Sequence, residues 1–146
     1  MSITIPIRPD TGAARTRLVT PAGATLTSLP PLSVYVHVPW CVRKCPYCDF
    51  NSHAAPGEIP ERAYLDALRS DLEQALPSIW GRQVVSVFIG GGTPSLLSAA
   101  GLDELLAMLR ACLNMWPDAE ITMEANPGTA EADRFRDYAA LSLIHI

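Results

Sequence analysis

The chain has 146 residues, of which 49% are hydrophobic and 18% are charged, so it is long enough to fold as one globular domain with a substantial core. Its net charge is -4 and it has no long run of Lys and Arg, which argues against a nucleic-acid partner. It has neither a secretory signal nor the roughly 20 consecutive apolar residues of a membrane helix, so we expect no transmembrane segment and a cytoplasmic location.

Residues 1–30 differ in composition from the rest of the chain. They are rich in Pro, Thr, Ala and Gly and show neither helical nor strand periodicity, which predicts a flexible N-terminal leader. Arg8, Arg15 and Arg17 would also suit an organellar transit peptide, but prolines interrupt any amphipathic helix there. We prefer the plain leader and expect the folded domain at residues 31–146.

After Pro30 the sequence alternates strand patterns with helix patterns. The segment VYVHV at 34–38 is rich in β-branched and aromatic side chains and predicts a first strand. Residues 61–76 carry leucines at helical spacing, which predicts a helix that stops at Pro77. The apolar run VVSVFIGGG at 84–92 predicts a second strand that ends in glycines.

The second half of the chain repeats this alternation. Ser98 can cap a helix that ends before Pro117 and whose apolar stripe consists of Leu102, Leu105, Leu109, Leu113 and Trp116. EITMEANPG at 120–128 predicts a third strand, Thr129 can cap a third helix, and LSLIHI at 141–146 would suit the start of a fourth strand. Successive strand–helix units imply parallel strands with right-handed crossovers, so the predicted fold class is α/β.

The unusual residues of the sequence all lie at the ends of the predicted strands. The first strand is followed by PWCVRKCPYCDF at 39–50, the second runs into GGGTPS at 90–95, and the third ends in EANPG at 124–128. In parallel α/β folds the binding site lies at the C-terminal ends of the strands, where the connecting loops gather. We therefore expect these three segments to form one site.

Three thiols lie close together in the first of these segments. Cys41, Cys45 and Cys48 have the spacing C-x3-C-x2-C, and thiolates at such intervals can bind iron or zinc. Arg43 and Lys44 between them would lower the thiol pKa values and offset the negative charge of a thiolate cluster. The preferred interpretation is an iron–sulfur cluster in which one iron lacks a protein ligand.

Spacing alone leaves other interpretations of the thiols open. A structural zinc ion would need a fourth ligand such as His37 or His53, a disulfide is disfavoured in a reducing compartment, and the thiols could also be unligated. Four aromatic residues could shield the loop from water, namely Tyr35, Trp40, Tyr47 and Phe50. The remaining cysteine, Cys112, falls on the apolar stripe of the second helix and is expected to be a buried, inert thiol.

The glycines at 90–92 remove side chains at a strand end, where a ligand could approach the backbone. A phosphate-binding loop would need a lysine after them, and none follows Gly92, so nucleoside triphosphate binding is not expected. A tight turn without a ligand is the alternative. Glu124 at the next strand end can accept hydrogen bonds from a ribose or an amine, although a structural role is also open.

These motifs resemble those of the radical S-adenosylmethionine (SAM) superfamily, whose fold is a full or partial (β/α) barrel. YVHVPWCVRKCPYCDFNSH at 35–53, FIGGGTPSLL at 88–97 and ITMEANPGT at 121–129 are similar to the oxygen-independent coproporphyrinogen III oxidase-like group, and within it to the heme chaperones. The resemblance runs from Pro31 to Tyr138.

The resemblance implies cofactors and residue roles. Cys41, Cys45 and Cys48 would hold a [4Fe-4S] cluster whose open iron binds SAM. The other residues implied in binding SAM are Tyr35, Tyr47, Gly91, Gly92, Thr93 and Glu124. In this family the reduced cluster passes an electron to SAM, and the radical released abstracts hydrogen.

One position distinguishes the branches of the group. The oxidases typically carry a further cysteine two residues after the third, where this chain has Phe50. The resemblance therefore favours a heme chaperone, which binds heme and delivers it to respiratory enzymes, over an oxidase of porphyrin biosynthesis. The His-Asn heme-binding motif of that branch is absent from this chain. The sequence does not decide whether the chain itself is an enzyme. A zinc-stabilised, non-catalytic fragment is a further alternative.

The number of predicted units is too small for a complete barrel. Three strand–helix units and a strand fragment cannot close a (β/α) barrel. We therefore expect a truncated N-terminal part of a partial TIM barrel, with residues 141–146 as a non-native tail. Because one sheet edge would be open and apolar, the chain by itself is expected to be poorly soluble and inactive.

Overall fold

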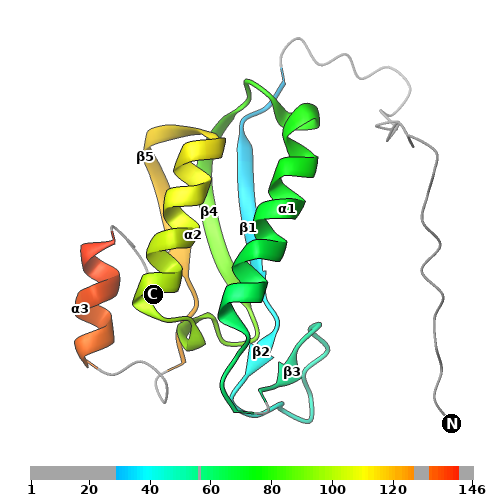
Figure 1. Ribbon diagram of the computed structural model, residues 1–146, viewed down its shortest axis with the longest axis vertical. Coiled ribbons are helices and arrows are strands. Elements are labelled where there is room, and N and C mark those ends of the chain that lie inside the picture. The colour runs from blue at the N-terminus through cyan, green and yellow to red at the C-terminus, as the bar shows by residue number, and fades with distance from the viewer. Residues whose placement is uncertain (1–28, 56, 127–131, 142–146) are drawn as a thin grey trace, which may run out of the picture.

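The computed structural model of the chain describes residues 29–55, 57–126 and 132–141. Strands and helices alternate along it, as Figure 1 shows. The main elements, in chain order, are β1 (Leu32–Val38), α1 (Glu61–Ile79), β4 (Gln83–Gly91), α2 (Ala99–Cys112), β5 (Asn114–Met123) and α3 (Ala132–Ala140). Shorter elements lie in the loops, namely β2 (Trp40–Cys41), β3 (His53–Ala54) and the 3-10 helix η1 (Pro94–Leu96).

The three long strands form a parallel sheet in the order β1-β4-β5. Tyr35 of β1 lies opposite Phe88 of β4, which lies opposite Thr122 of β5. Because the strands are parallel and each connection passes through a helix, all three strands end at the same edge of the sheet. The predicted α/β class with parallel strands is confirmed, and it places the three unusual segments at one edge.

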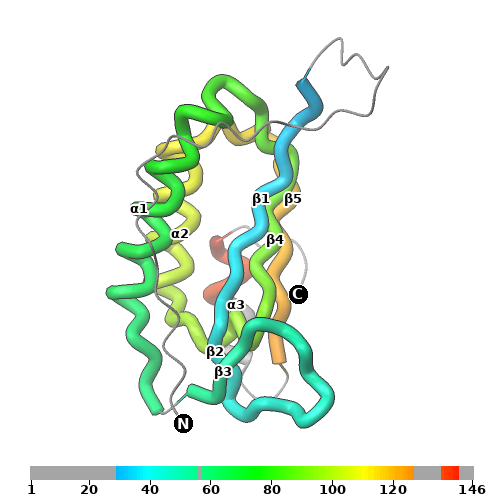
Figure 2. The backbone as a smooth tube through the Cα atoms, turned by 90° about the vertical axis from the view of Figure 1, so that its right-hand side faces the viewer, coloured from blue at the N-terminus to red at the C-terminus, as the bar shows by residue number. Residues whose placement is uncertain are grey.

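Helices α1 and α2 pack side by side against one face of the sheet, as Figure 2 shows. The apolar residues that alternate along the strands point towards these helices, because successive side chains of a strand face opposite sides. Tyr138 of α3 is fully buried, and its hydroxyl donates to the carbonyl oxygen of Ser95 at 3.4 Å. The fully buried aliphatic core consists of Val38, Val84, Val87, Ile89, Leu97, Leu102, Leu105 and Leu106.

The opposite face of the sheet carries polar and aromatic side chains within the described ranges. The rings of Tyr35 and Phe88 stack with centroids 6.0 Å apart and an interplanar angle of 18°. Next to them, the Ser86 hydroxyl donates to the Ser33 hydroxyl at 2.8 Å. Helices cover the other face, so this is the face that a closed barrel would turn inwards.

Two predicted helix ends were wrong. Helix α1 continues past Pro77 to Ile79, because a proline near the end of a helix removes only one hydrogen bond. Helix α2 begins after Ser98 as predicted, but it ends at Cys112 because Leu113 adopts an extended conformation. Trp116 therefore lies in β5, where it is exposed, and Cys112 at the helix end is half-buried rather than buried.

Strand β5 starts earlier than predicted and accommodates Pro117 through a change of register. Met115 pairs with Val84, but the next pair along β5 is Glu120 with Ser86. The residues between them leave the regular ladder, and there the missing N–H of a proline disrupts no ladder hydrogen bond.

Several predictions fall outside the described residues. They concern most of the leader, the Thr129 cap and residues 142–146.

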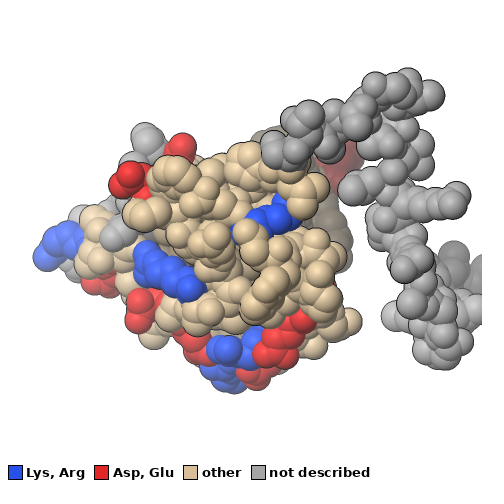
Figure 3. All heavy atoms as spheres, turned by 90° about the horizontal axis from the view of Figure 1, so that it is seen from above, with Lys and Arg blue, Asp and Glu red and all other residues tan. Residues whose placement is uncertain are grey.

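In the ranges that the structure describes, no helix is long and apolar enough to cross a membrane. Figure 3 looks onto the end of the fold where the strands begin, and there acidic and basic residues are interspersed on a mainly uncharged surface.

Candidate functional site

The cysteine loop, residues 41–52, follows shortly after the end of β1. The segments at its two ends are hydrogen-bonded to each other, and we call these paired segments the base of the loop. Strands β2 and β3 pair in parallel on either side of it. The His53 N–H donates to the Pro39 carbonyl at 2.7 Å, and the Ala55 N–H donates to the Cys41 carbonyl at 2.8 Å. The loop therefore starts from a fixed base at the C-terminal edge of the sheet (Figure 1).

The glycine-rich end of β4 lies directly against this base. The Gly92 N–H donates to the Val38 carbonyl and the Thr93 N–H to the Trp40 carbonyl, both at 2.7 Å. A Cβ atom on Gly92 would lie 2.4 Å from the Trp40 oxygen and 3.0 Å from the Cys41 sulfur. The lack of a side chain at Gly92 thus lets the backbone of the loop base approach the end of β4, and Thr93 is buried. That these residues also receive a ligand stays a prediction.

Gly91 and Glu124 come together at the same edge. Gly91 has a φ of 113°, a conformation that favours glycine, and its N–H donates to Glu124 Oε2 at 3.2 Å. Glu124 is exposed just after β5, and its own N–H donates to the Ile89 carbonyl at 3.0 Å. The structure thus brings together the residues predicted at the second and third strand ends.

The cysteines of the loop are free thiols, with Cys45 exposed and Cys41 and Cys48 half-buried. A hydrogen bond with Ser52, followed by one from the Phe50 backbone, holds the pKa of Cys48 below its usual value. This favours the thiolate, which is the form that binds iron. The donor chemistry of the loop therefore fits a thiolate-bound cluster.

The zinc interpretation receives no geometric support within the described parts of the chain. No three His, Cys, Asp or Glu side chains there are placed to hold one metal ion. An iron–sulfur cluster presents its iron atoms at separate corners, so its ligands need not converge on a single point. The absence of such a group among the described residues therefore bears on a single zinc ion and does not test a cluster.

His37 has a role that the sequence did not reveal. Its Nε2 lies 2.7 Å from the Asn51 carbonyl, which can only accept, so Nε2 carries the proton and Nδ1 accepts from the Tyr35 hydroxyl at 2.9 Å. The Tyr64 hydroxyl donates to the His37 carbonyl at 2.8 Å. His37 is therefore not a free zinc ligand, and His53 is exposed. The contact between Tyr35 and His37 could have been expected from the alternation of side chains along a strand, which places these two residues on the same face of the sheet.

The predicted aromatic shield around the thiols is absent from the described structure. Tyr47 is 84% exposed and Phe50 is 69% exposed. Trp40 is half-buried and meets the Tyr64 ring edge-on, with centroids 5.1 Å apart. Hydrogen bonding with Cys45 raises the pKa of Tyr47, so this side chain lies beside a thiol without covering it.

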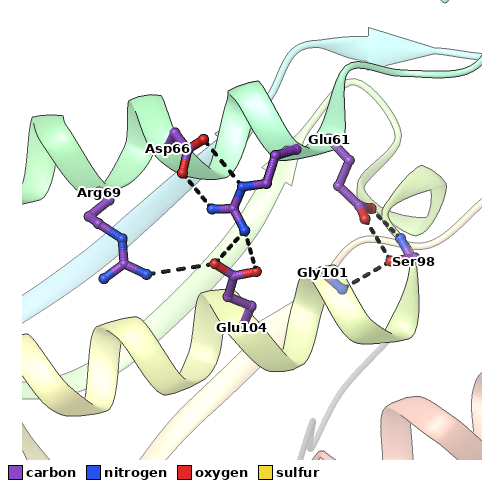
Figure 4. A network of polar contacts seen from close by, with 7 residues as sticks. Glu61, Asp66, Arg69, Ser98, Gly101 and Glu104 are labelled. Carbon is purple, nitrogen blue, oxygen red and sulfur yellow. Dashed lines mark hydrogen bonds and ion pairs between the residues drawn. The ribbon is translucent and has the colours of Figure 1, made fainter.

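Polar contacts tie α1 to α2 beside the site, as Figure 4 shows. Glu61 accepts from the Ser98 N–H at 2.6 Å and from the Ser98 hydroxyl at 2.7 Å. Ser98 caps α2 by accepting from the Gly101 N–H at 2.9 Å. An exposed ion pair between Arg62 and Glu104, at 2.7 Å, joins the same helices. These contacts fix the segments that follow the cysteine loop and the glycines relative to each other.

Comparisons with known proteins agree with the motifs. Residues 35–146 match the family model of the radical SAM superfamily. The chain is 59% identical over 113 residues to heme chaperone HemW of Escherichia coli (strain K12), a match that covers 77% of this chain and 30% of that protein. It is 50% identical over 125 residues to heme chaperone HemW of Haemophilus influenzae, covering 83% and 33%. It is 37% identical over 103 residues to the oxygen-independent coproporphyrinogen III oxidase of Escherichia coli, covering 70% and 22%.

A solved structure shares the fold. Coproporphyrinogen III oxidase (HemN) from Escherichia coli, described as a radical SAM enzyme, matches with a TM-score of 0.72 at 34% identity over 77% of this chain and 26% of that chain. The chain spans about a third of the length of the HemW proteins it matches. Because the family model extends from β1 through the cysteine loop and both later strand ends, the chain belongs to the radical SAM superfamily.

Proposed function

We propose that Cys41, Cys45 and Cys48 hold a [4Fe-4S] cluster, and that SAM binds beside it at the strand ends. Membership of the superfamily implies these two cofactors. When bound, they supply one-electron chemistry. The observation that carries the proposal is a chain of contacts at one edge of the sheet. The base of the cysteine loop meets the end of β4 at Gly92, and the end of β4 meets Glu124, just after β5, at Gly91.

The residues around the loop are available for this role. Tyr35 is 57% exposed and its hydroxyl is oriented by His37, while Tyr47 reaches solvent beside Cys45. We propose that both lie against SAM. The strand-end part of the proposed SAM site consists of Gly91, Gly92, Thr93 and Glu124.

The fourth cysteine provides a matched control for the cluster. Iron and acid-labile sulfide are measured after anaerobic reconstitution of the whole protein, together with the change that SAM causes in the electron paramagnetic resonance spectrum. Cys45→Ala is expected to abolish cluster retention and the SAM response, whereas Cys112→Ala, at the end of α2, retains both. Equal retention in the two variants, or stoichiometric zinc without sulfide, would count against the proposal.

For the whole protein we propose a heme chaperone that binds heme and passes it to heme-accepting respiratory proteins in the cytoplasm. Two observations support this over oxidation of coproporphyrinogen III. The chain is 59% identical to HemW of Escherichia coli but 37% identical to the oxidase of the same organism. Phe50 occupies the position at which a further cysteine is typical of the oxidases.

Heme transfer and decarboxylation are separable in one set of assays. The whole protein is loaded with heme and mixed with an apo respiratory hemoprotein, and transfer is followed by the absorption spectrum of the acceptor. The same preparation is incubated anaerobically with coproporphyrinogen III, SAM and a reductant. We expect heme transfer without decarboxylation. Decarboxylation at enzymatic turnover would establish the alternative, an oxidase of porphyrin biosynthesis.

A further inference from the structure

Two side chains bind three consecutive carbonyl groups at the end of the cysteine loop. The Lys44 ammonium group donates to the carbonyls of Phe50 and Ser52, both at 2.9 Å, and to the Ser52 hydroxyl at 3.2 Å. His37 donates to the Asn51 carbonyl between them at 2.7 Å. The path of the backbone from residue 50 to residue 52 is therefore fixed by side chains rather than by strand pairing.

Lys44 reaches these carbonyls from inside the same loop, directly before Cys45. An ammonium group has three donors, and the three oxygen atoms use all of them. The sequence suggested that Lys44 and Arg43 act alike, as positive charges near the thiols. The structure separates them, because Arg43 is exposed and makes no hydrogen bond or ion pair within the described residues.

Ser52 connects this arrangement to one of the cysteines. It is 3% exposed, and its hydroxyl oxygen lies 3.7 Å from the Cys48 sulfur. Because Lys44 only donates, the Ser52 hydroxyl accepts from it and directs its own proton elsewhere. The remaining partners within reach are the Cys48 sulfur and the Phe50 carbonyl, the latter at 3.4 Å.

We propose that Lys44 and Ser52 form a clasp that closes the cysteine loop and directs a hydroxyl hydrogen bond at the Cys48 sulfur. Both are positioning residues: Lys44 fixes the path of the loop, and Ser52 acts on a ligand atom. The second part rests on the proposed function, in which Cys48 binds the cluster. Hydrogen bonds to ligand sulfurs are one of the factors that set the reduction potential of an iron–sulfur cluster.

The closure of the loop is tested without the cluster, by hydrogen exchange on the whole apo protein. Lys44→Met and Arg43→Met each remove one positive charge from adjacent positions. Lys44→Met is expected to speed exchange at the Ser52 and His53 amides about tenfold, because it removes charged hydrogen bonds, while Arg43→Met leaves these amides unchanged. Unchanged exchange in α2 shows that the fold is intact. Equal rates at residues 52 and 53 in the two variants would overturn the clasp.

The effect on the sulfur is tested in the reconstituted protein by redox titration of the cluster. Ser52→Ala removes a hydroxyl without changing charge and is expected to lower the reduction potential, whereas Ser78→Ala, on α1, leaves it unchanged. An unaltered potential in Ser52→Ala would refute the role on Cys48. If the parent protein takes up no cluster, the proposed function fails, and the exchange measurement still decides whether Lys44 closes the loop.

Discussion

Replacing Gly92 by alanine is expected to separate the end of β4 from the cysteine loop. The new Cβ would lie 2.4 Å from the Trp40 oxygen, whereas ordinary contacts begin at 3.4 Å, so the two backbones must move apart by about 1 Å. That movement breaks the hydrogen bonds that the Gly92 and Thr93 amides donate at 2.7 Å. Overpacking costs about 1–3 kcal/mol and each lost hydrogen bond about 0.5–1.5 kcal/mol, so the expected destabilisation is about 2–6 kcal/mol.

The assay compares Gly92→Ala with Gly81→Ala in the whole protein. Urea denaturation gives the free energy of unfolding, and iron and sulfide analysis gives the cluster content. Gly81 has a φ of 75° and no atom within 4 Å of an added Cβ, so its replacement costs only the backbone strain of about 1–2 kcal/mol. Gly81→Ala is therefore expected to destabilise the fold modestly and to leave cluster loading unchanged.

Cluster loading distinguishes a steric effect at the site from a general loss of stability. The Gly92→Ala protein is expected to bind little iron and sulfide even without urea, where it remains folded. The reason is that the added methyl group also lies 3.0 Å from the Cys41 sulfur. A Gly92→Ala protein with the parental unfolding free energy and the parental iron content would refute the reasoning.

Three further changes test the packing and the polar contacts. Ser98→Ala removes the cap of α2 and is expected to cost about 1 kcal/mol in urea denaturation; an unchanged midpoint would contradict the cap. Leu102→Ala empties a fully buried position and should cost about 2–5 kcal/mol in the same assay, whereas Val42→Ala, at an exposed position, should change stability by less than about 0.5 kcal/mol. Burial raises the pKa of Tyr64 from 10.0 to about 12, so folding favours the neutral phenol, and this contribution is complete below pH 10. The parent should therefore lose stability relative to Tyr64→Phe between pH 10 and about 12, and a constant difference across that range would show that Tyr64 does not titrate as expected.

The regular elements were predictable because their signals are local. Alternation in VYVHV and the leucine spacing after Ser98 depend only on neighbours in the sequence, and both produced the expected element types. The helix ends were less predictable. Pro77 does not end α1, because a proline near the end of a helix removes only one hydrogen bond. Trp116 does not continue α2, because the chain becomes extended at Leu113 and enters β5.

The candidate site was predictable in position but not in its contacts. The strand-end rule brought the cysteine loop, Gly91 and Glu124 to one edge without any knowledge of distances. The roles of His37 and Lys44 depend on the carbonyl groups of residues 50–52, and a sequence does not show where backbone oxygens point. The close contact of Gly92 with the backbone of the loop base was not predicted, because the approach of that backbone is likewise invisible in the sequence.

The hydrogen bonds from Gly92 and Thr93 to the residues before the cysteine loop can form only after β4 has been synthesised. A ribosome makes the three cysteines of the loop before it makes the strand end against which their base is fixed. At a synthesis rate of about 5–20 residues per second, seconds pass before β4 can pair with β1. During that interval the newly made thiols lack the support of β4 and depend on the reducing capacity of their surroundings.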